Sequence, residues 1–548
     1  MTLSTWTNLD RENNKQLLDK SYDVIVIGGG ITGAGIALDA ATRGMNVVVL
    51  EMQDFAAGTS SRSTKLVHGG LRYLKNFEVG LVAEVGKERD IVYENAPHIT
   101  TPEWMMLPFY KGGNFGPIST NIGLRVYDFL VGVKRAERRK MLSVDETMKR
   151  EPLLKRDGLK GSGYYVEYKT DDARLTMEVM KKAVEKGAVA FNYMKVEQLL
   201  HNDGNVIGVR VNDEVNGDTH DVYSHYVVNA TGPWVDELRT LDQSKKGKEL
   251  FHTKGVHLVF DQNDFPLQQA VYFDAPDGRM IFAIPRDGKT YVGTTDTPYD
   301  GDLDHPVTTE ADKAYVLDAI HQMFPDVHVS DADIESTWAG IRPLIHEEGK
   351  DPSEISRKDE ILESDSGLMS IAGGKLTGYR QMAEDVVDLV CSKLRTIDGR
   401  PFVKSQTKHL PLAGGEVGGS KGFAELTQRI LHETTQEKID KQIMATWLNR
   451  YGANTRLVLD YFIALQGYDE QARAVLAELH YAIDHEAVYK PVDFLIRRTG
   501  DLFFNIEGVK THKERVVSEM AKQFEWTDEQ YEAYLDEVDQ LIAEAEMG

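Results

Sequence analysis

The segment Tyr22–Glu51, YDVIVIGGGITGAGIALDAATRGMNVVVLE, decides the fold of this chain. An apolar run, Tyr22–Ile27, stops at three glycines and passes into an alanine- and glycine-rich segment that ends near Gly44. A second apolar run, Met45–Leu50, follows directly. This order predicts a strand, a helix and a second strand, and a unit of this length predicts parallel strands joined by a right-handed crossover.

The turn between the first strand and the helix has the spacing of a nucleotide-binding loop. Gly28, Gly30 and Gly33 form G-x-G-x-x-G, in which the first glycine permits a tight turn, the second lets a pyrophosphate approach the backbone and the third lets the helix pack on the strand. Glu51 ends the second strand, where a carboxylate accepts hydrogen bonds from ribose hydroxyls and repels a 2′-phosphate. The pattern favours a dinucleotide other than NADP over the alternative, a glycine turn that binds nothing.

Two later segments distinguish FAD from NAD. The segment 227–232, VVNATG, is a strand that ends in a turn of small residues, and the segment 370–378, SIAGGKLTG, is a strand that enters a helix through paired glycines. Each brings backbone close to a long dinucleotide. One nucleotide-binding unit with two distant returning contacts suits an extended FAD better than an exchangeable nicotinamide, although each segment alone is also compatible with a structural turn.

The rest of the chain predicts two further units. Period-two strands with Asp-Gly turns fill 251–296, which indicates an antiparallel sheet. Helix formers dominate after about residue 411. We therefore predict an α/β protein with a Rossmann-like FAD-binding domain, an antiparallel-sheet substrate domain and an all-α C-terminal domain. The expected boundaries are 20–75, 160–235 and 336–396 for the FAD-binding domain, 76–159 and 236–335 for the substrate domain, and 405–548 for the helical domain.

Composition excludes several classes of function. The 548 residues include 87 acidic and 63 basic side chains, and the net charge of −24 argues against nucleic-acid binding. The single cysteine, Cys391, cannot form an intrachain disulfide or a cysteine-rich zinc site, so we expect no metal site and a reducing cytoplasmic location. No run of eighteen apolar residues and no signal peptide is apparent, so we expect no membrane span.

A second group of motifs carries a family resemblance. It begins with the segment 58–74, GTSSRSTKLVHGGLRYL, and continues in five further motifs and in the helical region. These are ATGPW at 230–234, KGVH at 254–257, GTTD at 293–296, AGIRPL at 339–344, GGKLT at 373–377 and DFLIRRT at 493–499. Together they resemble the bacterial, quinone-linked FAD-dependent glycerol-3-phosphate dehydrogenases of the D-amino-acid-oxidase-like superfamily, over essentially the whole chain after the leader.

The resemblance implies oxidation of sn-glycerol 3-phosphate to dihydroxyacetone phosphate on FAD, with electrons passed to a membrane quinone. It implies a non-covalent cofactor, since no family tethering pattern is present. The cofactor-binding residues that it implies, with those of the glycine loop, are Gly28, Gly30, Ile31, Thr32, Gly33, Glu51, Thr59, Ser60, Ser61, Thr64, Ala230, Gly232, Gly340, Gly374, Lys375, Leu376 and Thr377. The implied substrate-binding residues are Arg72, Tyr73, Thr294, Arg342, Arg357 and Lys375.

These residue types suit the implied chemistry. A phosphate dianion needs several cationic donors, and guanidinium groups match its oxygens in pairs. Hydride transfer from the substrate also requires an acceptor for the hydroxyl proton, for which histidine is the natural candidate. His257 and His68 both align with positions near the flavin. We prefer His257 as the base and His68 as an orienting residue, with Arg342 assisting, but the sequence leaves the choice between the histidines open.

The segment 122–140 is the candidate membrane contact. Its apolar and aromatic part, Ile122–Val133, runs into the basic cluster KRAERRK at 134–140. An interfacial helix that sits among anionic headgroups needs this combination. A substrate-domain helix with a solvated basic end explains the pattern equally well.

Three rival functions are open at this stage. A glycerol-3-phosphate oxidase would catalyse the same dehydrogenation and pass electrons to oxygen, yielding hydrogen peroxide, and a flavin-binding sensor would need no base. A third rival, an oxidase of the same superfamily with another substrate, would not need the phosphate-binding cations. The oligomeric state, monomer or homodimer, is also left open.

Overall fold

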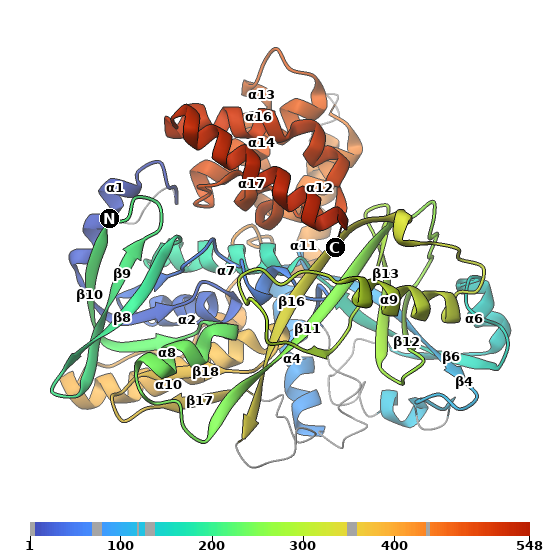
Figure 1. Cartoon of the computed structure of the whole chain (residues 1–548), viewed down its shortest axis with the longest axis horizontal. Coiled ribbons are helices and arrows are strands. Elements are labelled where there is room, and N and C mark those ends of the chain that lie inside the picture. Colours follow the sequence, from blue (N-terminus) through green and yellow to red (C-terminus); the bar gives the residue numbers. More distant parts are fainter. Residues whose placement is uncertain are drawn as a thin grey trace.

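A computed structural model describes residues 6–67, 79–117, 120–125, 138–347, 359–433 and 439–547. Two β-sheets lie side by side, and a group of helices from the C-terminal part of the chain packs over them (Figure 1). This arrangement confirms the predicted α/β class with an all-α C-terminal region.

The first sheet, sheet A, contains the predicted nucleotide-binding unit. Its strands are β1 (Ser21–Ile27), β2 (Val47–Leu50), β7 (Val189–Phe191), β8 (Met194–Asn202), β9 (Asn205–Asp213), β10 (Thr219–Asn229), β17 (Glu360–Glu363) and β18 (Met369–Ala372). The order is β17-β18-β10-β1-β2-β7, and β9 pairs with both β10 and β8. The strand β1 is parallel to β2 and to β10, as the crossover rule predicts. Segments far apart in the chain therefore end together at one edge.

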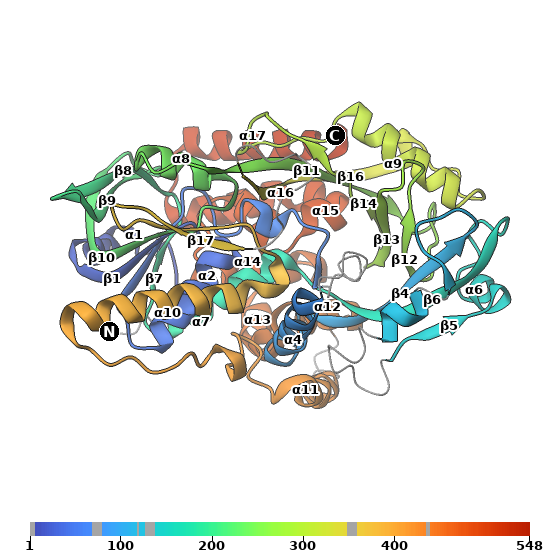
Figure 2. The same cartoon turned by 90° about the horizontal axis from the view of Figure 1, so that it is seen from below.

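Beside sheet A, α2 (Ile31–Thr42) packs against two other helices, α7 (Asp172–Glu185) and α10 (Tyr379–Asp398). Figure 2 shows α10 running alongside α2. The first helix is buried on most of its surface, which explains its alanine and glycine content, because only small side chains let both neighbours approach. The short helices α1 (Arg11–Asn14) and α8 (Val235–Leu241) flank the same sheet.

The second sheet, sheet B, is mostly antiparallel, as predicted. Its strands are β3 (Leu66–Val67), β4 (Thr101–Tyr110), β5 (Lys140–Leu142), β6 (Leu159–Lys169), β11 (Lys248–Asp261), β12 (Ala270–Asp274), β13 (Met280–Arg286), β14 (Lys289–Gly293), β15 (Thr297–Pro298) and β16 (Ile334–Glu347). Three helices lie between strands of sheet B in the sequence: α4 (Val79–Asn95), α6 (Val144–Arg150) and α9 (Glu310–Met323).

Two strands are placed differently from the expected domain boundaries. The sequence analysis assigned 160–235 and 336–396 to the FAD-binding domain, but β6 pairs with β4 and β16 pairs with β11, both in sheet B. The physical reason is that each of these long strands forms its ladder of hydrogen bonds with sheet B over nearly its whole length. The same two segments thus contribute to both sides of the space between the sheets.

The C-terminal helices are α11 (Gly419–Glu433), α12 (Lys441–Tyr451), α13 (Thr455–Ala464), α14 (Glu470–His485), α15 (Asp501–Phe504), α16 (Ile506–Phe524) and α17 (Asp528–Met547). The first four share a core around Trp447 and Tyr451. The last helix, α17, packs against β16 of sheet B. A π-helical turn, Asp493–Arg498, precedes α15 and points back toward sheet A. The helical region therefore contacts both sheets.

The candidate membrane segment is only partly described, since 126–137 lie outside the described residues. At its start, residues 120–125 are helical, with Ile122 59% exposed and Leu124 buried. At its end, Arg139 donates to Asn121, and the Lys140 ammonium lies over the Trp104 ring. Among the described helices, none is long and apolar enough to cross a membrane.

Candidate active site

A cavity of about 700 Å³ is lined by residues of both sheets. The glycine loop after β1 and the turn after β2 line one part of it, and side chains of β6, β12 and β13 line another. The carboxyl ends of β1, β10 and β18 meet here because these strands are parallel, which is where open α/β sheets bind ligands.

The glycine loop is closed against its neighbours. Gly28 has a φ of +105°, and a β-carbon there would lie 2.6 Å from the carbonyl oxygen of Ala230. A β-carbon on Gly33 would lie 1.9 Å from the carbonyl oxygen of Gly28, so this glycine allows α2 to pack on the turn. Gly30 is different, because its β-carbon would approach only the flexible Ser60 side chain, at 3.0 Å. Gly30 thus faces the cavity, whereas Gly28 and Gly33 allow neighbouring backbone segments to approach closely.

The first turn of α2 is suited to an anion. Gly30 caps this helix without a side-chain hydrogen bond, and the first turn has no acidic residue. The Ile31 N–H donates to the Ser60 hydroxyl, 3.0 Å away, which brings the Thr59–Ser61 turn next to the helix end. The positive end of the helix dipole is therefore left available to a pyrophosphate.

Glu51 holds the end of β2 against the glycine loop. One carboxylate oxygen accepts the Gly29 N–H at 2.6 Å and the other accepts the Gln53 N–H at 2.8 Å. Burial raises the pKa of Glu51 above its ordinary value, although both hydrogen bonds oppose this change. Helix end, glycine turn and acid together match what an extended dinucleotide requires, so the residues present fit FAD.

Arg342 of β16 is one of the cationic side chains that line the cavity. Its guanidinium donates to the Thr294 hydroxyl at 3.1 Å and to the Asp296 carboxylate at 3.2 Å, and its side chain is 34% exposed. Gly255 makes this arrangement possible, because a β-carbon there would lie 2.4 Å from the Thr294 hydroxyl and 2.9 Å from the Arg342 guanidinium. Lys375, at the start of the turn before α10, lines the same cavity.

His257 lies behind the cavity wall. It is 1% exposed, and its Nε2 lies 3.1 Å from the hydroxyl of Thr64, which does line the cavity. Its ring stacks on Trp338 with centroids 4.7 Å apart. Burial, together with the positive charges of Arg342 and Lys65, lowers the pKa of His257 well below its ordinary value. The imidazole is therefore neutral near physiological pH.

Thr64 itself is fixed from both sides. The Tyr291 hydroxyl donates to the Thr64 carbonyl at 3.0 Å, and the Trp338 indole donates to the neighbouring Ser63 carbonyl at 3.1 Å. Lys65 forms a buried ion pair with Asp172 at 2.6 Å. The backbone of 63–65 is thus tied to sheet B and to α7, which holds the Thr64 hydroxyl in place.

The structure brings most of the predicted site residues together. Those that line the cavity are Gly28, Gly30, Ile31, Thr32, Glu51, Thr59, Ser60, Thr64, Ala230, Gly232, Thr294, Gly340, Arg342, Gly374, Lys375, Leu376 and Thr377. Gly33, Ser61 and His257 lie behind the lining. His68, Arg72, Tyr73 and Arg357 lie outside the described residues.

Sequence reasoning did not single out the aromatic part of the lining. Tyr272 and Phe282 face each other across β12 and β13 and stack with ring centroids 4.2 Å apart. Tyr165 and Met280 lie on the same side of the cavity. The signal was available, because alternate residues of paired strands share a face, but it needs the register of two strands that the sequence does not give.

Among the described residues, no cluster of histidine, cysteine and acidic side chains could hold a metal ion.

Comparison with known proteins identifies the class of enzyme. The family model "FAD dependent oxidoreductase" matches residues 23–380, and the model "C-terminal domain of alpha-glycerophosphate oxidase" matches residues 405–531. The chain belongs to the FAD-dependent oxidoreductase family, and its cofactor is FAD.

Individual relatives narrow this class further. The chain is 58% identical to a protein of Bacillus subtilis named aerobic glycerol-3-phosphate dehydrogenase, with 97% of each chain covered. It is 56% identical to a Staphylococcus aureus protein of the same name, covering 100% of this chain and 99% of the relative. These relatives confirm the family resemblance drawn from the sequence motifs.

Solved structures agree with these relatives. The glycerol-3-phosphate dehydrogenase of Bacillus halodurans, solved in complex with FAD, is 46% identical with a TM-score of 0.85, and 98% of each chain is covered. The L-alpha-glycerophosphate oxidase of Mycoplasma pneumoniae, 16% identical with a TM-score of 0.56 over 71% of this chain and 97% of that one, shows the shared fold alone.

Proposed function

We propose that this enzyme oxidises sn-glycerol 3-phosphate to dihydroxyacetone phosphate. The observation that carries the proposal is the position of Arg342 and Lys375, which reach one cavity from opposite sheets beside the nucleotide-binding loop. A phosphate at this end would be bound by paired guanidinium donors and an ammonium group. The names of the relatives with 56–58% identity support the same substrate.

Bound FAD would accept the hydride from carbon 2 of the substrate. The phosphate would hold the substrate through Arg342, whose guanidinium is already oriented by Thr294 and Asp296. Because a preorganised donor loses little freedom on binding, this orientation favours a single pose of the substrate in the cavity. We also propose Arg72, Tyr73 and Arg357 as substrate contacts, on the family resemblance.

The proton of the substrate hydroxyl requires its own route. Thr64 lines the cavity and His257 lies directly behind it, so we propose a relay in which the Thr64 oxygen accepts the substrate proton as its own proton passes to Nε2 of His257. The carbonyl of the product forms as the hydride leaves. His257 thereby keeps the role of base preferred from the sequence, but it acts through Thr64 rather than by contact, and His68 is the alternative acceptor.

The electron acceptor is proposed to be a membrane quinone. The names of the relatives support a dehydrogenase, and the segment 122–140 would place the cytoplasmic enzyme on an anionic membrane surface. The alternative is an oxidase that reduces oxygen to hydrogen peroxide. The description of the matched C-terminal family model, which names alpha-glycerophosphate oxidase, supports this alternative.

Anaerobic mixing of the FAD-loaded enzyme with glycerol 3-phosphate tests the substrate. We expect rapid bleaching of the flavin absorbance, and no bleaching with unphosphorylated glycerol at the same concentration. Reduction by dithionite serves as the control that the flavin is competent. A flavin that dithionite bleaches and glycerol 3-phosphate does not would overturn the substrate assignment.

A further inference from the structure

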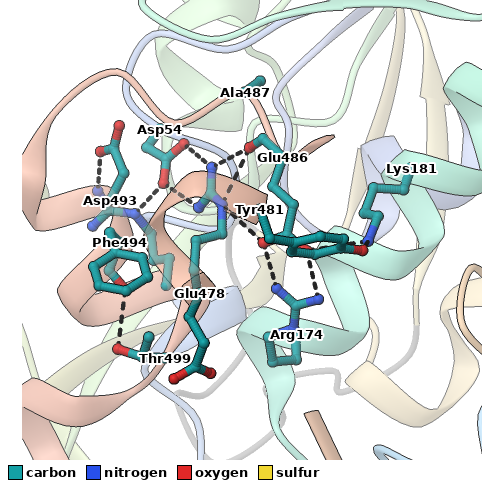
Figure 3. A network of polar contacts seen from close by, with 12 residues as sticks. Asp54, Arg174, Lys181, Glu478, Tyr481, Glu486, Ala487, Asp493, Phe494 and Thr499 are labelled. Carbon is teal, nitrogen blue, oxygen red and sulfur yellow. Dashed lines mark hydrogen bonds and ion pairs between the residues drawn. The ribbon is translucent and has the colours of Figure 1, made fainter. Parts of the chain in front are cut away.

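The sequence motif Asp493–Thr499 has no part in the cavity, yet it carries two consecutive buried arginines. Both reach the same carboxylate, Asp54, which is 1% exposed. Arg498 binds it with two nitrogens at 2.7 and 2.9 Å, and Arg497 adds a third bond at 2.5 Å. Figure 3 labels Asp54 and shows the dashed contacts that its carboxylate makes. Neighbouring residues of an ordinary helix point in different directions, and the π-helical winding of this turn lets both converge.

Asp54 belongs to the turn that closes the FAD-binding site. It stands three positions after Glu51, which holds the Gly29 and Gln53 N–H groups. Within the same turn, the Ala56 N–H donates to the Gly29 carbonyl at 3.1 Å, and Phe55 is fully buried. A β-carbon on Gly29 would lie 2.5 Å from the Phe55 ring. The turn and the glycine loop therefore cannot move independently.

The arginine pair is in turn fixed within the helical region. Arg498 also donates to the Glu486 carbonyl at 2.8 Å, and Arg497 donates to Asp493 at 2.7 Å. The adjacent Arg498 and Arg497 charges hold the pKa of Asp54 below its usual range, although burial acts in the opposite direction. All three charges stay ionised, so the contact is a rigid, directional link between two parts of the chain.

This link differs from the other ion pairs at the interface between the helical region and the rest of the chain. The same interface already holds Arg174 of α7 against Glu486 at 2.7 Å, and Lys181 against Glu486 at 3.1 Å (Figure 3). A buried ion pair adds little net stability over apolar packing, but its geometry fixes direction. Unlike these two ion pairs, the contact with Asp54 ends in the Glu51–Ala57 turn.

We propose that Arg497 and Arg498 are positioning residues for FAD. The helical region, through this pair, holds the Glu51–Ala57 turn in the geometry that receives the adenosine ribose. FAD binding and docking of the Asp493–Arg498 turn are therefore coupled, so that each strengthens the other. This inference rests on the placement of the FAD ribose at Glu51 and is independent of the substrate.

FAD titration of the apoprotein tests the proposal. We expect Arg498→Gln and Asp54→Asn each to raise the FAD dissociation constant at least tenfold. Arg498→Lys keeps the charge and loses the paired donors, so its FAD dissociation constant should lie between that of the parent and those of the other two variants. The matched control is Arg174→Gln, which removes ion pairs from the same interface without touching Asp54. It should change FAD affinity less than threefold.

If Arg174→Gln weakened FAD binding as much as Arg498→Gln, the Arg497–Arg498 pair would only help to hold the interface together, and the proposal would be wrong. Unchanged FAD affinity in a folded Arg498→Gln variant would also overturn it. Hydrogen exchange on the unaltered protein covers variants that do not fold. By reciprocity, adding FAD should slow amide exchange in 493–499 about tenfold, although these residues do not line the cavity. Unchanged exchange there would contradict the coupling. Neither measurement involves glycerol 3-phosphate, so the substrate assignment is tested separately.

Discussion

At the residue scale, Gly30 and Gly33 of the nucleotide loop should respond differently to substitution. A side chain at Gly30 would meet only the Ser60 hydroxyl in the protein itself, but it would occupy the place of the pyrophosphate. We expect Gly30→Val to fold and to purify without flavin. Gly33→Val should fail to fold, because its β-carbon would overlap the Gly28 carbonyl.

Circular dichroism and the flavin-to-protein absorbance ratio separate the two cases. A Gly30→Val protein with a full complement of FAD would show that the pyrophosphate does not lie against this residue. A well-folded Gly33→Val protein would show that α2 can move away from the turn.

Arg342 provides a test of phosphate recognition. Replacing it with alanine removes a charge-assisted donor from the cavity, a loss of about 2–4 kcal/mol that corresponds to roughly 30- to 1000-fold in kcat/KM. FAD content should be unchanged. Arg279→Ala is the control, because Arg279 lines the same cavity from β12–β13 and pairs with Asp277.

Steady-state kinetics with glycerol 3-phosphate and with glycerol measures this effect. The loss in the Arg342→Ala variant should be far smaller for glycerol, which has no phosphate to bind. Equal losses for both substrates, or an equal loss in the Arg279→Ala variant, would contradict a specific phosphate role.

The buried His257 predicts an unusual pH profile. A base works in its neutral form, and a lowered pKa keeps the imidazole neutral to lower pH. At saturating substrate, the rate of flavin reduction should therefore stay level from about pH 8 down through pH 6.5, where an ordinary histidine would become half protonated. Stopped-flow reduction of the flavin measures this profile.

The same experiment tests the relay. Thr64→Val should slow reduction strongly with FAD still bound, and Thr64→Ser, which keeps the hydroxyl, should be close to the parent. A rate that halves near pH 6.5, or a Thr64→Val variant as fast as the parent, would rule out proton transfer through this pair.

Most of the predicted site residues that the structure describes line the cavity, and the reason is local. The glycine loop, Glu51 and the 373–377 turn are contiguous motifs whose chemistry is visible in the residue types. The indirect position of His257 could not be predicted, since it depends on how β11 pairs with β14 and β16 and on which face the ring then occupies. The role of Gly255 depends on the same pairing.

At the element scale, the contact between α2 and α10 lies next to the Lys375–Gly378 turn, the second turn that we expect to bind the cofactor. A β-carbon on Gly35 of α2 would lie 3.0 Å from the Tyr379 ring and 3.2 Å from the Ala383 β-carbon. Tyr379 is the first residue of α10, directly after the Lys375–Gly378 turn that lines the cavity. Crowding here should push that turn away from the cofactor.

We expect Gly35→Val to lower the free energy of unfolding by about 1–3 kcal/mol and to weaken FAD binding. The control is Gly378→Ala in the turn at the start of the same helix, where a β-carbon would meet nothing within 4 Å. Thermal unfolding and FAD titration measure both effects. Wild-type FAD affinity in the Gly35→Val variant would show that α10 can shift without moving the turn.

The sequence predicted the elements better than their sheet membership. Apolar runs and glycine turns located β1, α2 and β2 closely, and they located the end of β10 and the turn before α10. The domain boundaries drawn from the sequence put β6 and β16 in the FAD-binding domain, whereas both strands pair within sheet B. A strand's periodicity reports which face is buried and does not report which strand lies beside it.

At the scale of the whole molecule, a net charge of −24 opposes binding to anionic lipid, so any membrane contact must be local. If 122–140 is that contact, anionic vesicles should stimulate turnover with a lipophilic quinone. Salt should weaken the stimulation, because exposed charges are screened over about 8 Å at physiological ionic strength. Replacing Lys134, Arg135, Arg138, Arg139 and Lys140 with glutamine should abolish it.

A second set of five glutamine substitutions controls for net charge. The exposed cations Arg395, Lys404, Lys408, Lys421 and Arg429 stand outside 122–140 in the sequence, and their loss should leave the vesicle effect intact. Reduction of a small soluble dye should be unchanged in both variants. Stimulation that survives in the first variant would move the contact to another surface, and peroxide formation in air as fast as quinone turnover would favour the oxidase.

The ion pair between Asp54 and Arg498 can form only late in the synthesis of the chain. The two residues are 444 positions apart in the chain. At a ribosomal rate of about 5–20 residues per second, roughly 20–90 s pass between the synthesis of one partner and that of the other. During this interval the nascent turn after β2 carries a carboxylate whose cationic partners do not yet exist. A chain that stops before Arg497 would lack both cationic partners of Asp54, so under the coupling proposed above it should bind FAD more weakly than the full-length protein.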